Sequence, residues 1–342
     1  MRTLDKTILY IVGGDGGDRA AQAAQAGKVV ARASDLRKLV DDPSEILPVS
    51  RNFFRHPNEL TIGHFRVLVN LITEPEESRR ELENVRKLLR GVRSRVINPP
   101  DAVLRTTRDR VARLLTGIPD LIVPKAVRFS AAKPAIAERM IRSAGIEPPI
   151  ILREAGTHGG KIVGCFDSVE ATVAALQGGR DHVATQFVDF SSADNLYRKY
   201  RVYFIGKGKV LRHMLISDHW NVHAKDRLRF MAERPELVAE ERALFESDDY
   251  PLPFSPKVRA ALHRVAERMG MDFFGMDFGV TRDEQVVLFE ANATMRFFPY
   301  SPEPMFEYSL RSFAPAQAAF RDMLGLEPQP ATLPYEIKLQ SA

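Results

Sequence analysis

Residues 271–292 decide the fold of this chain, and they read MDFFGMDFGVTRDEQVVLFEAN. The part from Phe273 to Thr281 is largely apolar and typical of a strand, whereas Arg282 to Gln285 is polar and typical of a turn. The part from Val286 to Glu290 opens with β-branched residues and favours a return strand. The stretch therefore predicts a β-hairpin in which Thr281 pairs with Val286.

This hairpin would collect oxygen ligands on one face. Counting back from the turn puts Asp277 directly opposite Glu290, and side-chain alternation puts Asn292 on the face of Glu290. Like charges directly opposed across a ladder destabilise it, so we expect a cation between them. Oxygen ligands without Cys or His favour Mg²⁺, which completes its shell with water and substrate phosphates. The alternative is a solvent-exposed edge hairpin with an incidental acidic pair.

Composition indicates an ordinary globular protein. The chain has 342 residues with 44% hydrophobic and 27% charged content, enough for two or three domains. A net charge of +5 suits acidic substrates such as nucleotides but is too small to predict binding to nucleic acid. The single Cys165 excludes an intramolecular disulfide. No apolar run is long enough for a transmembrane helix, so we expect a cytoplasmic protein with neither a membrane nor a nucleic-acid partner.

The first 98 residues predict an open α/β domain. Thr7 to Val12 reads as a buried strand and leads into the glycine-rich turn Gly13 to Asp18 and an alanine-rich helix. Arg19 stands where a dinucleotide fingerprint needs its third glycine, so a plain strand–turn–helix is favoured over a phosphate site. Further strands at 65–72 and 95–97, separated by a charged helix at 76–90, continue the alternation.

A second glycine-rich loop joins two strands. Pro149 to Arg153 and Ile162 to Phe166 read as strands on either side of Gly156 to Lys161. Glycines let backbone N–H groups approach a phosphate closely, so the loop predicts a flap over a bound phosphate. An ordinary hairpin tip is the alternative. Val183 to Val188 follows as a strand that could cross between two lobes.

A second hairpin carries two arginines. Tyr200 to Ile205 and Val210 to Ile216 flank Gly206-Lys207-Gly208-Lys209. In the closest register one face holds Arg201, Tyr203, Arg212 and Met214. Two guanidinium groups on one face predict an anion between them, unless each arginine has its own carboxylate.

The chain between this hairpin and the first one is mixed. Asp218 to His223 is a polar loop with the only tryptophan, and its two histidines match no zinc spacing, which favours structural histidines. Residues 225–253 are charged and interrupted by prolines, so we expect a surface excursion. Ser255 and Pro256 begin an amphipathic helix that Gly270 ends.

This order of elements resembles the ATP-grasp superfamily, in the branch of glutathione synthetases and ribosomal-protein glutamate ligases. The resemblance covers residues 96–325 and begins at Asn98-Pro99-Pro100. The strings LYRKYRV at 196–202 and ISDHW at 216–220 resemble a less characterised bacterial subgroup. The implied fold is α/β (α+β), with two α+β lobes that clasp a nucleotide. Its implied domains are an N-terminal α/β domain (1–98), a linker helix with a lid (99–186) and a catalytic lobe (187–342).

The resemblance also implies site residues. Asp277, Glu290 and Asn292 match the magnesium-binding triplet, which Mn²⁺ could occupy instead. Arg201 and Arg212 match arginines that hold phosphate and an acyl-phosphate intermediate. The flap over the phosphates of ATP corresponds to Gly156, Thr157, His158, Gly159, Gly160 and Lys161.

The nucleobase end is implied as well. Backbone groups at Phe187 and Val188 would meet adenine, and Gln186 stands where relatives often carry an acidic residue. Arg153 stands in place of a family lysine at the end of the strand before the flap, and Arg108 or Arg110 replaces a second one. Arginine keeps the charge and adds bidentate phosphate contact.

The implied activity is ATP-dependent ligation of a carboxylate to an amine through an acyl phosphate. The substrates would be small-molecule or peptide carboxylates and amines, and a homo-oligomer is compatible with the resemblance. His219, Trp220 and Asn221 would line the acceptor side. The alternatives are a small-molecule kinase of the same fold and a non-catalytic nucleotide-binding regulatory protein.

Overall fold

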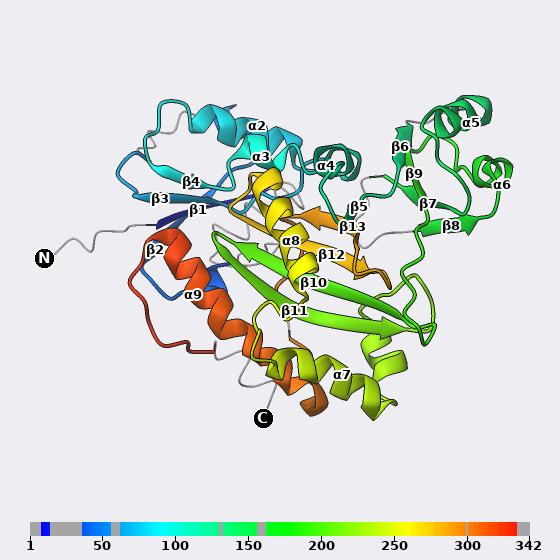
Figure 1. Ribbon diagram of the computed structural model, residues 1–342. Coiled ribbons are helices and arrows are strands. Elements are labelled where there is room, and N and C mark those ends of the chain that lie inside the picture. Colours follow the sequence, from blue (N-terminus) through cyan, green and yellow to red (C-terminus); the bar gives the residue numbers. More distant parts are fainter. Residues whose placement is uncertain are drawn as a thin grey trace, which may run out of the picture.

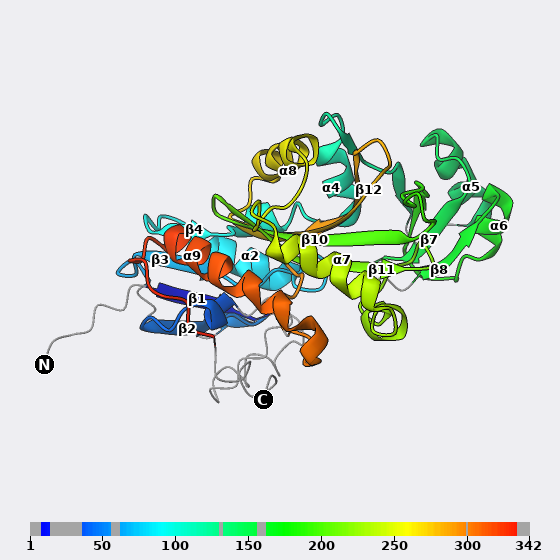
Figure 2. The same ribbon diagram turned by 60° about the horizontal axis from the view of Figure 1, so that its bottom comes forward.

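The computed structural model describes residues 8–13, 36–55, 62–129, 133–155, 162–298 and 300–333. Within these ranges the strands form three sheets, which belong to an N-terminal domain, a central lobe and a lid. Figures 1 and 2 show the N-terminal sheet and the lid at opposite ends, with the long strands of the central sheet between them. The predicted mixed α/β architecture is confirmed.

The N-terminal sheet is parallel throughout, as the alternating sequence predicts. Every residue of its two middle strands is buried, which is the usual state of a parallel sheet covered on both faces. The spatial order is β2 (Ser44–Pro48), β1 (Ile8–Val12), β3 (Val67–Asn70) and β4 (Arg95–Ile97), and helix α2 (Arg79–Leu88) connects β3 to β4. The glycine-rich turn after Gly13 and the alanine-rich stretch lie outside the described residues.

The lid is an antiparallel sheet with two helices packed against it. Its strands, in spatial order, are β6 (Ala126–Phe129), β9 (His182–Gln186), β7 (Ile150–Glu154) and β8 (Ile162–Phe166), and its helices are α5 (Pro134–Ser143) and α6 (Val169–Ala174). The loop between β7 and β8, residues 156–161, lies outside the described residues.

The central sheet carries both predicted hairpins. Its order is β11 (Gly208–Ser217), β10 (Tyr197–Ile205), β12 (Phe273–Val280), β13 (Val286–Asn292) and β5 (Leu121–Ile122). The sheet is antiparallel except for β5, which runs parallel to β13. β5 lies within the range 99–186 that the sequence assigned to the linker helix and lid, yet it belongs to the central sheet.

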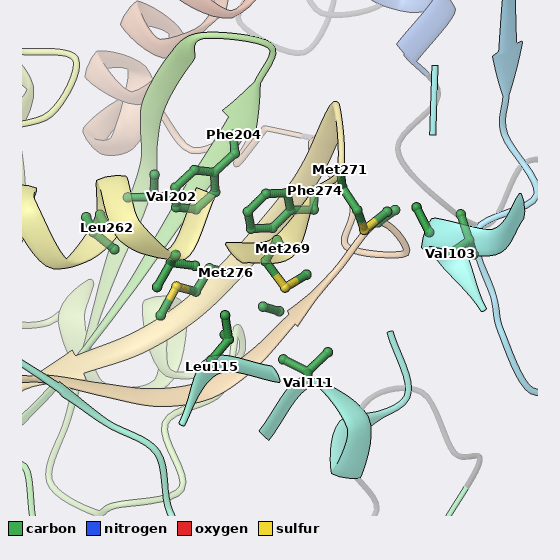
Figure 3. Packing of buried hydrophobic residues seen from close by; sticks show 14 of the residues in the cluster. Val103, Val111, Leu115, Val202, Phe204, Leu262, Met269, Met271, Phe274 and Met276 are labelled. Atoms are coloured by element: carbon green, nitrogen blue, oxygen red, sulfur yellow. The ribbon is translucent and has the colours of Figure 1, made fainter. Parts of the chain in front are cut away.

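One hydrophobic core joins the N-terminal domain to the central lobe. Helices α3 (Pro100–Val103), α4 (Arg108–Leu115) and α8 (Pro256–Met269) pack on one face of the central sheet. Figure 3 shows Val111 and Leu115 of α4 near Met269 and Met276, and the rings of Phe204 and Phe274 stack with centroids 4.3 Å apart. The predicted start and end of α8 are confirmed, because Ser255 caps it and Gly270 adopts a φ of 60°.

The first hairpin has the predicted central pair and a different turn. Asp277 lies opposite Glu290, as predicted. The expected Thr281–Val286 pair is wrong, because Val280 pairs with Val286 and the loop is one residue longer. A bulge at Phe289 then shifts the register by one residue, so that the two carboxylates still face each other.

The second hairpin also contains a bulge. Its register is the closest one from Ile205–Gly208 up to Val202–Leu211, but Arg201 then pairs with His213 and leaves Arg212 as the extra residue. Met214 pairs with Tyr200 and is 1% exposed in the core, so it does not share the face of Arg201 as expected. A period-two pattern cannot reveal this shift, because each strand keeps its alternation on either side of a bulge.

The expected surface excursion at 225–253 is wrong. It contains a short π-helix, η3 (Arg227–Met231), and helix α7 (Pro235–Glu246), which packs on β11 and buries Phe245. The guanidinium of Arg227 donates to both carboxylate oxygens of Glu241 at 2.8 and 2.6 Å, and both residues are buried. Arg227 and Glu241 read as surface residues in the sequence, but they neutralise each other inside the protein.

No helix in the described ranges is both long and apolar enough to span a membrane.

Asn98 joins the N-terminal sheet to β12. Its Oδ1 accepts from the N–H groups of Asp272 and Phe273 at 3.1 and 2.9 Å, and its Nδ2 donates to the Phe273 carbonyl at 2.7 Å. Its carbonyl accepts from the side chain of Asn70 at 2.9 Å, and its φ is 51°, in the left-handed region that Asn tolerates.

We expect Asn98→Ala to lower the free energy of unfolding by about 3 kcal/mol. The variant leaves buried backbone groups of Asp272 and Phe273 unpaired, and alanine has no side-chain hydrogen bonds to offset the cost of a positive φ. Urea unfolding measures this. The control is Asn98→Gly, which loses the same bonds but tolerates the φ, and it should be less destabilised than the alanine variant. An alanine variant within 0.5 kcal/mol of wild type, on the order of a surface substitution, would contradict this role.

Candidate functional site

A cavity of about 630 Å³ lies between the lid and the central sheet. It is lined by β7 and β9 from the lid, by β10 to β13 from the central sheet, and by residues 220–224 of the loop after β11. This volume is in the range of small-molecule and cofactor sites. A smaller pocket of about 60 Å³ adjoins it where the N-terminal domain, the lid and the central lobe meet.

Asp277 and Arg201 form a bidentate ion pair on the floor of the cavity. Arg201 Nε lies 2.6 Å from Asp277 Oδ1 and Nη2 lies 2.8 Å from Oδ2, and Lys199 Nζ lies 3.7 Å from the same Oδ2. Asp277 is only 6% exposed. Burial raises the pKa of Asp277, but Arg201 and Lys199 outweigh it, so the net pKa lies below the ordinary value. The carboxylate is therefore ionised over the physiological pH range.

Glu290 is held less tightly than Asp277. Its Oε1 accepts from Asn292 Nδ2 at 2.9 Å and lies 3.1 Å from Arg108 Nη2. Its Oε2 has no hydrogen bond within the described part of the chain, and the side chain is 36% exposed. Asn292 Oδ1 accepts from the N–H groups of Thr294 and Met295 at 2.9 and 3.0 Å. The hairpin thus presents one fully bonded carboxylate and one with a free oxygen.

The carboxylate oxygens of Asp277 and Glu290 suit a hard divalent cation, whereas the amide oxygen of Asn292 is already bonded. The described residues contain no group of three His, Cys, Asp or Glu side chains arranged for a metal, so two carboxylates are what the hairpin offers. That set suits a cation that takes its remaining ligands from water and phosphate. Asn292 Oδ1 already accepts two backbone bonds, so its use as a ligand would require release of one of them.

The cavity carries more positive than negative charge. Arg153, at the end of β7, is partly buried, and burial together with the neighbouring Arg108 lowers its pKa to about 10. Two adjacent guanidinium groups repel unless an anion lies between them. The cations that line the cavity are Arg108, Arg153, Lys199, Arg201 and Arg296, and the anions are Asp277 and Glu290.

The strand that links the lid to the central lobe leaves few free backbone groups. The Phe187 N–H donates to the Pro149 carbonyl at 2.8 Å, and the Gln186 N–H donates to the Lys125 carbonyl at 2.9 Å. The Phe187 carbonyl and the Val188 N–H belong to one trans peptide and point in opposite directions, so only one of them can face a bound ring. Gln186, Phe187 and Val188 all line the cavity.

Arg212 is not brought together with Arg201 in the cavity. Its Nε donates to the Phe297 carbonyl at 2.9 Å, and its guanidinium lies 3.8 Å from the centroid of the Tyr300 ring. It is 6% exposed, and burial lowers its pKa. The flap residues Gly156, Thr157, His158, Gly159, Gly160 and Lys161 lie outside the described residues.

Sequence reasoning missed several residues of the cavity, among them Lys199, His213 and Arg296. Lys199 shares the face of Arg201 by simple alternation along β10, so the pattern could have revealed it. His213 faces the cavity only because of the bulge at Arg212. Burial lowers the pKa of His213 well below its ordinary value and nearby arginines lower it further, so the imidazole is neutral.

Not all of the remaining site candidates lie in the cavity. Arg108 lies in the cavity, whereas Arg110 is exposed and donates to the Leu104 carbonyl at 2.8 Å. Trp220 and Asn221 line the cavity, but His219 does not, and its Nε2 lies 3.7 Å from Asp226 Oδ1. The ring of Trp220 meets that of Phe187 edge-on, with centroids 5.7 Å apart.

The chain matches no protein-family model and no curated protein. It is similar to solved structures over nearly its whole length. One is the ATP-grasp ligase PsnB complexed with minimal precursor, with a TM-score of 0.50, 16% identity, and coverage of 94% of this chain and 99% of that one. Another is VanG D-Ala:D-Ser ligase from Enterococcus faecalis, with a TM-score of 0.51, 12% identity and the same coverage. The chain therefore has the ATP-grasp fold, and the resemblance drawn from its sequence is confirmed at that level.

We expect Asp277→Asn to lower the free energy of unfolding by about 3 kcal/mol at pH 7, because the partly buried Arg201 loses its counter-charge. Since the folded-state pKa of Asp277 is depressed, the ion pair contributes stability above the unfolded pKa and loses it as pH falls through the folded pKa. Urea unfolding should therefore show a shallower loss of stability in acid for the variant.

The control is the double variant Arg201→Met with Asp277→Leu, which replaces both charges by apolar groups. It should be less destabilised than Asp277→Asn alone. Equal destabilisation of the two proteins would mean that packing, and not charge pairing, makes this position important.

Proposed function

We propose that this chain is an ATP-dependent ligase that joins a carboxylate to an amine through an acyl phosphate. The observation that carries the proposal is the excess of cations facing two carboxylates in one cavity between the lid and the central sheet. A nucleoside triphosphate with a divalent cation would balance these charges. The ATP-grasp fold supports the same conclusion, and PsnB and the VanG protein are described as ligases.

In the first step, a substrate carboxylate oxygen attacks the γ-phosphorus of ATP, and the bond from phosphorus to the bridging oxygen of ADP breaks. In the second step, the nitrogen of the amine attacks the carbonyl carbon of the acyl phosphate, and inorganic phosphate leaves as the amine gives up a proton. Phosphorylation is needed because a free carboxylate is a poor electrophile. The protein would act mainly by positioning and charge neutralisation.

The chain's own residues divide this work. Arg201 and Lys199 would contact the transferred phosphoryl group from the central sheet, while Arg153 and Arg108 would hold the remaining phosphates from the other side. Asp277 and Glu290 would hold Mg²⁺ or Mn²⁺, which when bound supplies further positive charge to the phosphate oxygens. The lid would close over the nucleotide and exclude water, which otherwise hydrolyses the acyl phosphate.

The other site assignments remain part of the proposal. The flap from Gly156 to Lys161 would cover the phosphates. The strand Gln186-Phe187-Val188 would meet adenine with one backbone group and the Gln186 side chain. Arg212 would act from outside the cavity, by holding the backbone of Phe297 next to Arg296 at the cavity wall.

Phosphate release from ATP and Mg²⁺ tests this function. The protein is assayed with pooled amino acids, dipeptides and small carboxylic acids. A ligase requires one component with a carboxylate and another with an amine for full release. A kinase would instead leave a stable phosphoester and no free phosphate, and a regulatory protein would bind nucleotide without turnover.

We expect Glu290→Gln to lower Mg²⁺-dependent phosphate release by roughly 100-fold or more, because the free carboxylate oxygen is replaced by a neutral amide. Glu290 is partly exposed, so the variant should keep the fold, unlike one at the buried Asp277. The matched control is Asp283→Asn, in the exposed turn of the same hairpin, which should keep the wild-type rate. If Glu290→Gln released phosphate at the wild-type rate, Glu290 would not be a metal ligand.

Trp220 offers an optical test of the nucleotide site. It is the only tryptophan of the chain and it lines the cavity, so MgADP binding should change the intrinsic fluorescence in a saturable way. Trp220→Phe should lose the signal while calorimetry still detects binding. Heat of binding in the wild type without any change in emission would place the nucleotide elsewhere.

A further inference from the structure

The positive charge of this chain is concentrated in one short stretch. Residues 79–113 contain eleven Lys or Arg and four Asp or Glu, which is a net charge of +7, against +5 for the whole chain. The remaining chain is therefore slightly acidic. Ten of the eleven cations are arginine, whose planar fork matches carboxylate and phosphate groups.

The fold turns this stretch into one exposed surface, which we call the basic face. All of its cations except Arg108 are exposed. At 3.6 residues per turn, those on α2 fall within an arc of about 120° on its solvent side. Helices α2 and α3 are in contact and α4 follows α3 along the chain, and all three lie toward the top of Figure 1. The exposed members are Arg79, Arg80, Arg86, Lys87, Arg90, Arg93, Arg95, Arg105, Arg110 and Arg113.

Only part of this charge is neutralised within the protein. Arg79 pairs with Glu83 at 3.8 Å and Arg86 with Asp101 at 3.4 Å, both exposed pairs that contribute little. Within the described residues, six cations have no carboxylate partner: Arg80, Lys87, Arg90, Arg93, Arg105 and Arg110, the last of which donates to a backbone carbonyl. The basic face therefore keeps a strong attraction for anions.

The basic face runs into the candidate site. Arg105 directly precedes Thr106 and Thr107, which line the small pocket between the three domains, and Arg108 lines both this pocket and the main cavity. The small pocket is also lined by Arg128 and Arg153 and by the carboxylates of Glu74, Glu76, Asp109, Glu154 and Glu290. A chain-like anion that lies along the basic face could thus extend one of its groups to the site.

We propose that the basic face docks an acidic segment of a peptide or protein whose carboxylate is the ligated substrate. The docking itself does not depend on the proposed ligase function. Only the statement that the bound carboxylate is ligated rests on that function. Two observations favour a peptide. Residues 79–113 contain no aromatic side chain on which a nucleic-acid base could stack. The exposed large apolar residues that would insert into a membrane lie elsewhere: Ile46, Phe54, Ile136, Leu228 and Met305.

Fluorescence anisotropy with a fluorescein-labelled octaglutamate peptide tests the docking without nucleotide. We expect saturable binding that weakens as salt rises, and at least a tenfold weaker affinity for Arg80→Glu with Arg90→Glu. The matched control is Lys133→Glu, at the N-cap of α5, with Arg139→Glu on that helix. It changes the total charge equally at exposed positions, and its affinity should stay within twofold of wild type. Arg80→Gln with Arg90→Gln should show an affinity between those of the wild type and of the Arg→Glu variant. Because it only removes the two charges, it controls for a folding defect caused by charge reversal.

The rival partners are measured in the same assay. A labelled octauridylate RNA, or phosphatidylserine vesicles, that bind more tightly than octaglutamate and depend on Arg80 and Arg90 would overturn the proposal. The proposal would also be overturned if the α5 control weakened octaglutamate binding as much as the Arg80 and Arg90 variant does. Binding would then depend on the net charge of the protein and not on the basic face.

The docking and the ligase can fail separately. If wild type ligates free amino acids and does not bind octaglutamate, the docking is wrong and the ligase stands. If octaglutamate binds through Arg80 and Arg90 but neither the pools nor octaglutamate with an amine cause phosphate release, the docking stands and the ligase is wrong. If both hold, octaglutamate should raise phosphate release in the presence of an amine, with a higher KM for the peptide in the reversed variant.

Discussion

The buried ion pair between Arg201 and Asp277 is the interaction on which the site depends. Moving an ionised carboxylate out of water costs several kcal/mol, and this cost is recovered only with excellent geometry. Here the guanidinium meets both carboxylate oxygens at 2.6 and 2.8 Å across the pair of neighbouring strands β10 and β12. The pair keeps Asp277 ionised and fixed in the cavity floor. The neighbouring Lys199 adds a second positive charge beside the same carboxylate. The two cations therefore exceed the charge of Asp277 and can attract a further anion to the cavity floor.

Two bulges decide which side chains of the two hairpins face the cavity. The bulge at Phe289 keeps Glu290 opposite Asp277 although the turn is longer than the sequence suggests. The bulge at Arg212 turns His213 toward the cavity and lets Arg212 hold the Phe297 carbonyl. Bulges commonly re-aim side chains beside functional sites. Both lie next to the Arg201–Asp277 pair, so the irregular backbone is concentrated where ligand-facing groups are needed.

The sequence predicts the fold better than it predicts the site. Period-two strands, caps at Ser255 and Gly270 and the acidic hairpin are local signals, and each is present in the structure. The bulges are not local signals, because they depend on how two strands meet. The burial of Arg227 with Glu241 escaped for the same reason, since each residue alone reads as surface. Lys199 is different, because alternation with Arg201 was sufficient to place it in the cavity.

The two carboxylates of the hairpin are not equivalent. Both oxygens of Asp277 are bonded and the side chain is buried, whereas Glu290 keeps one oxygen free and is more than a third exposed. A cation that arrives from the cavity would therefore meet Glu290 first, at little cost in broken contacts. Asp277 could bind the cation only if Arg201 and Lys199 weakened their contacts with its carboxylate and paired in part with the incoming anion. Cation and anion would then bind together more readily than either alone, because each relieves the charge that the other leaves uncompensated.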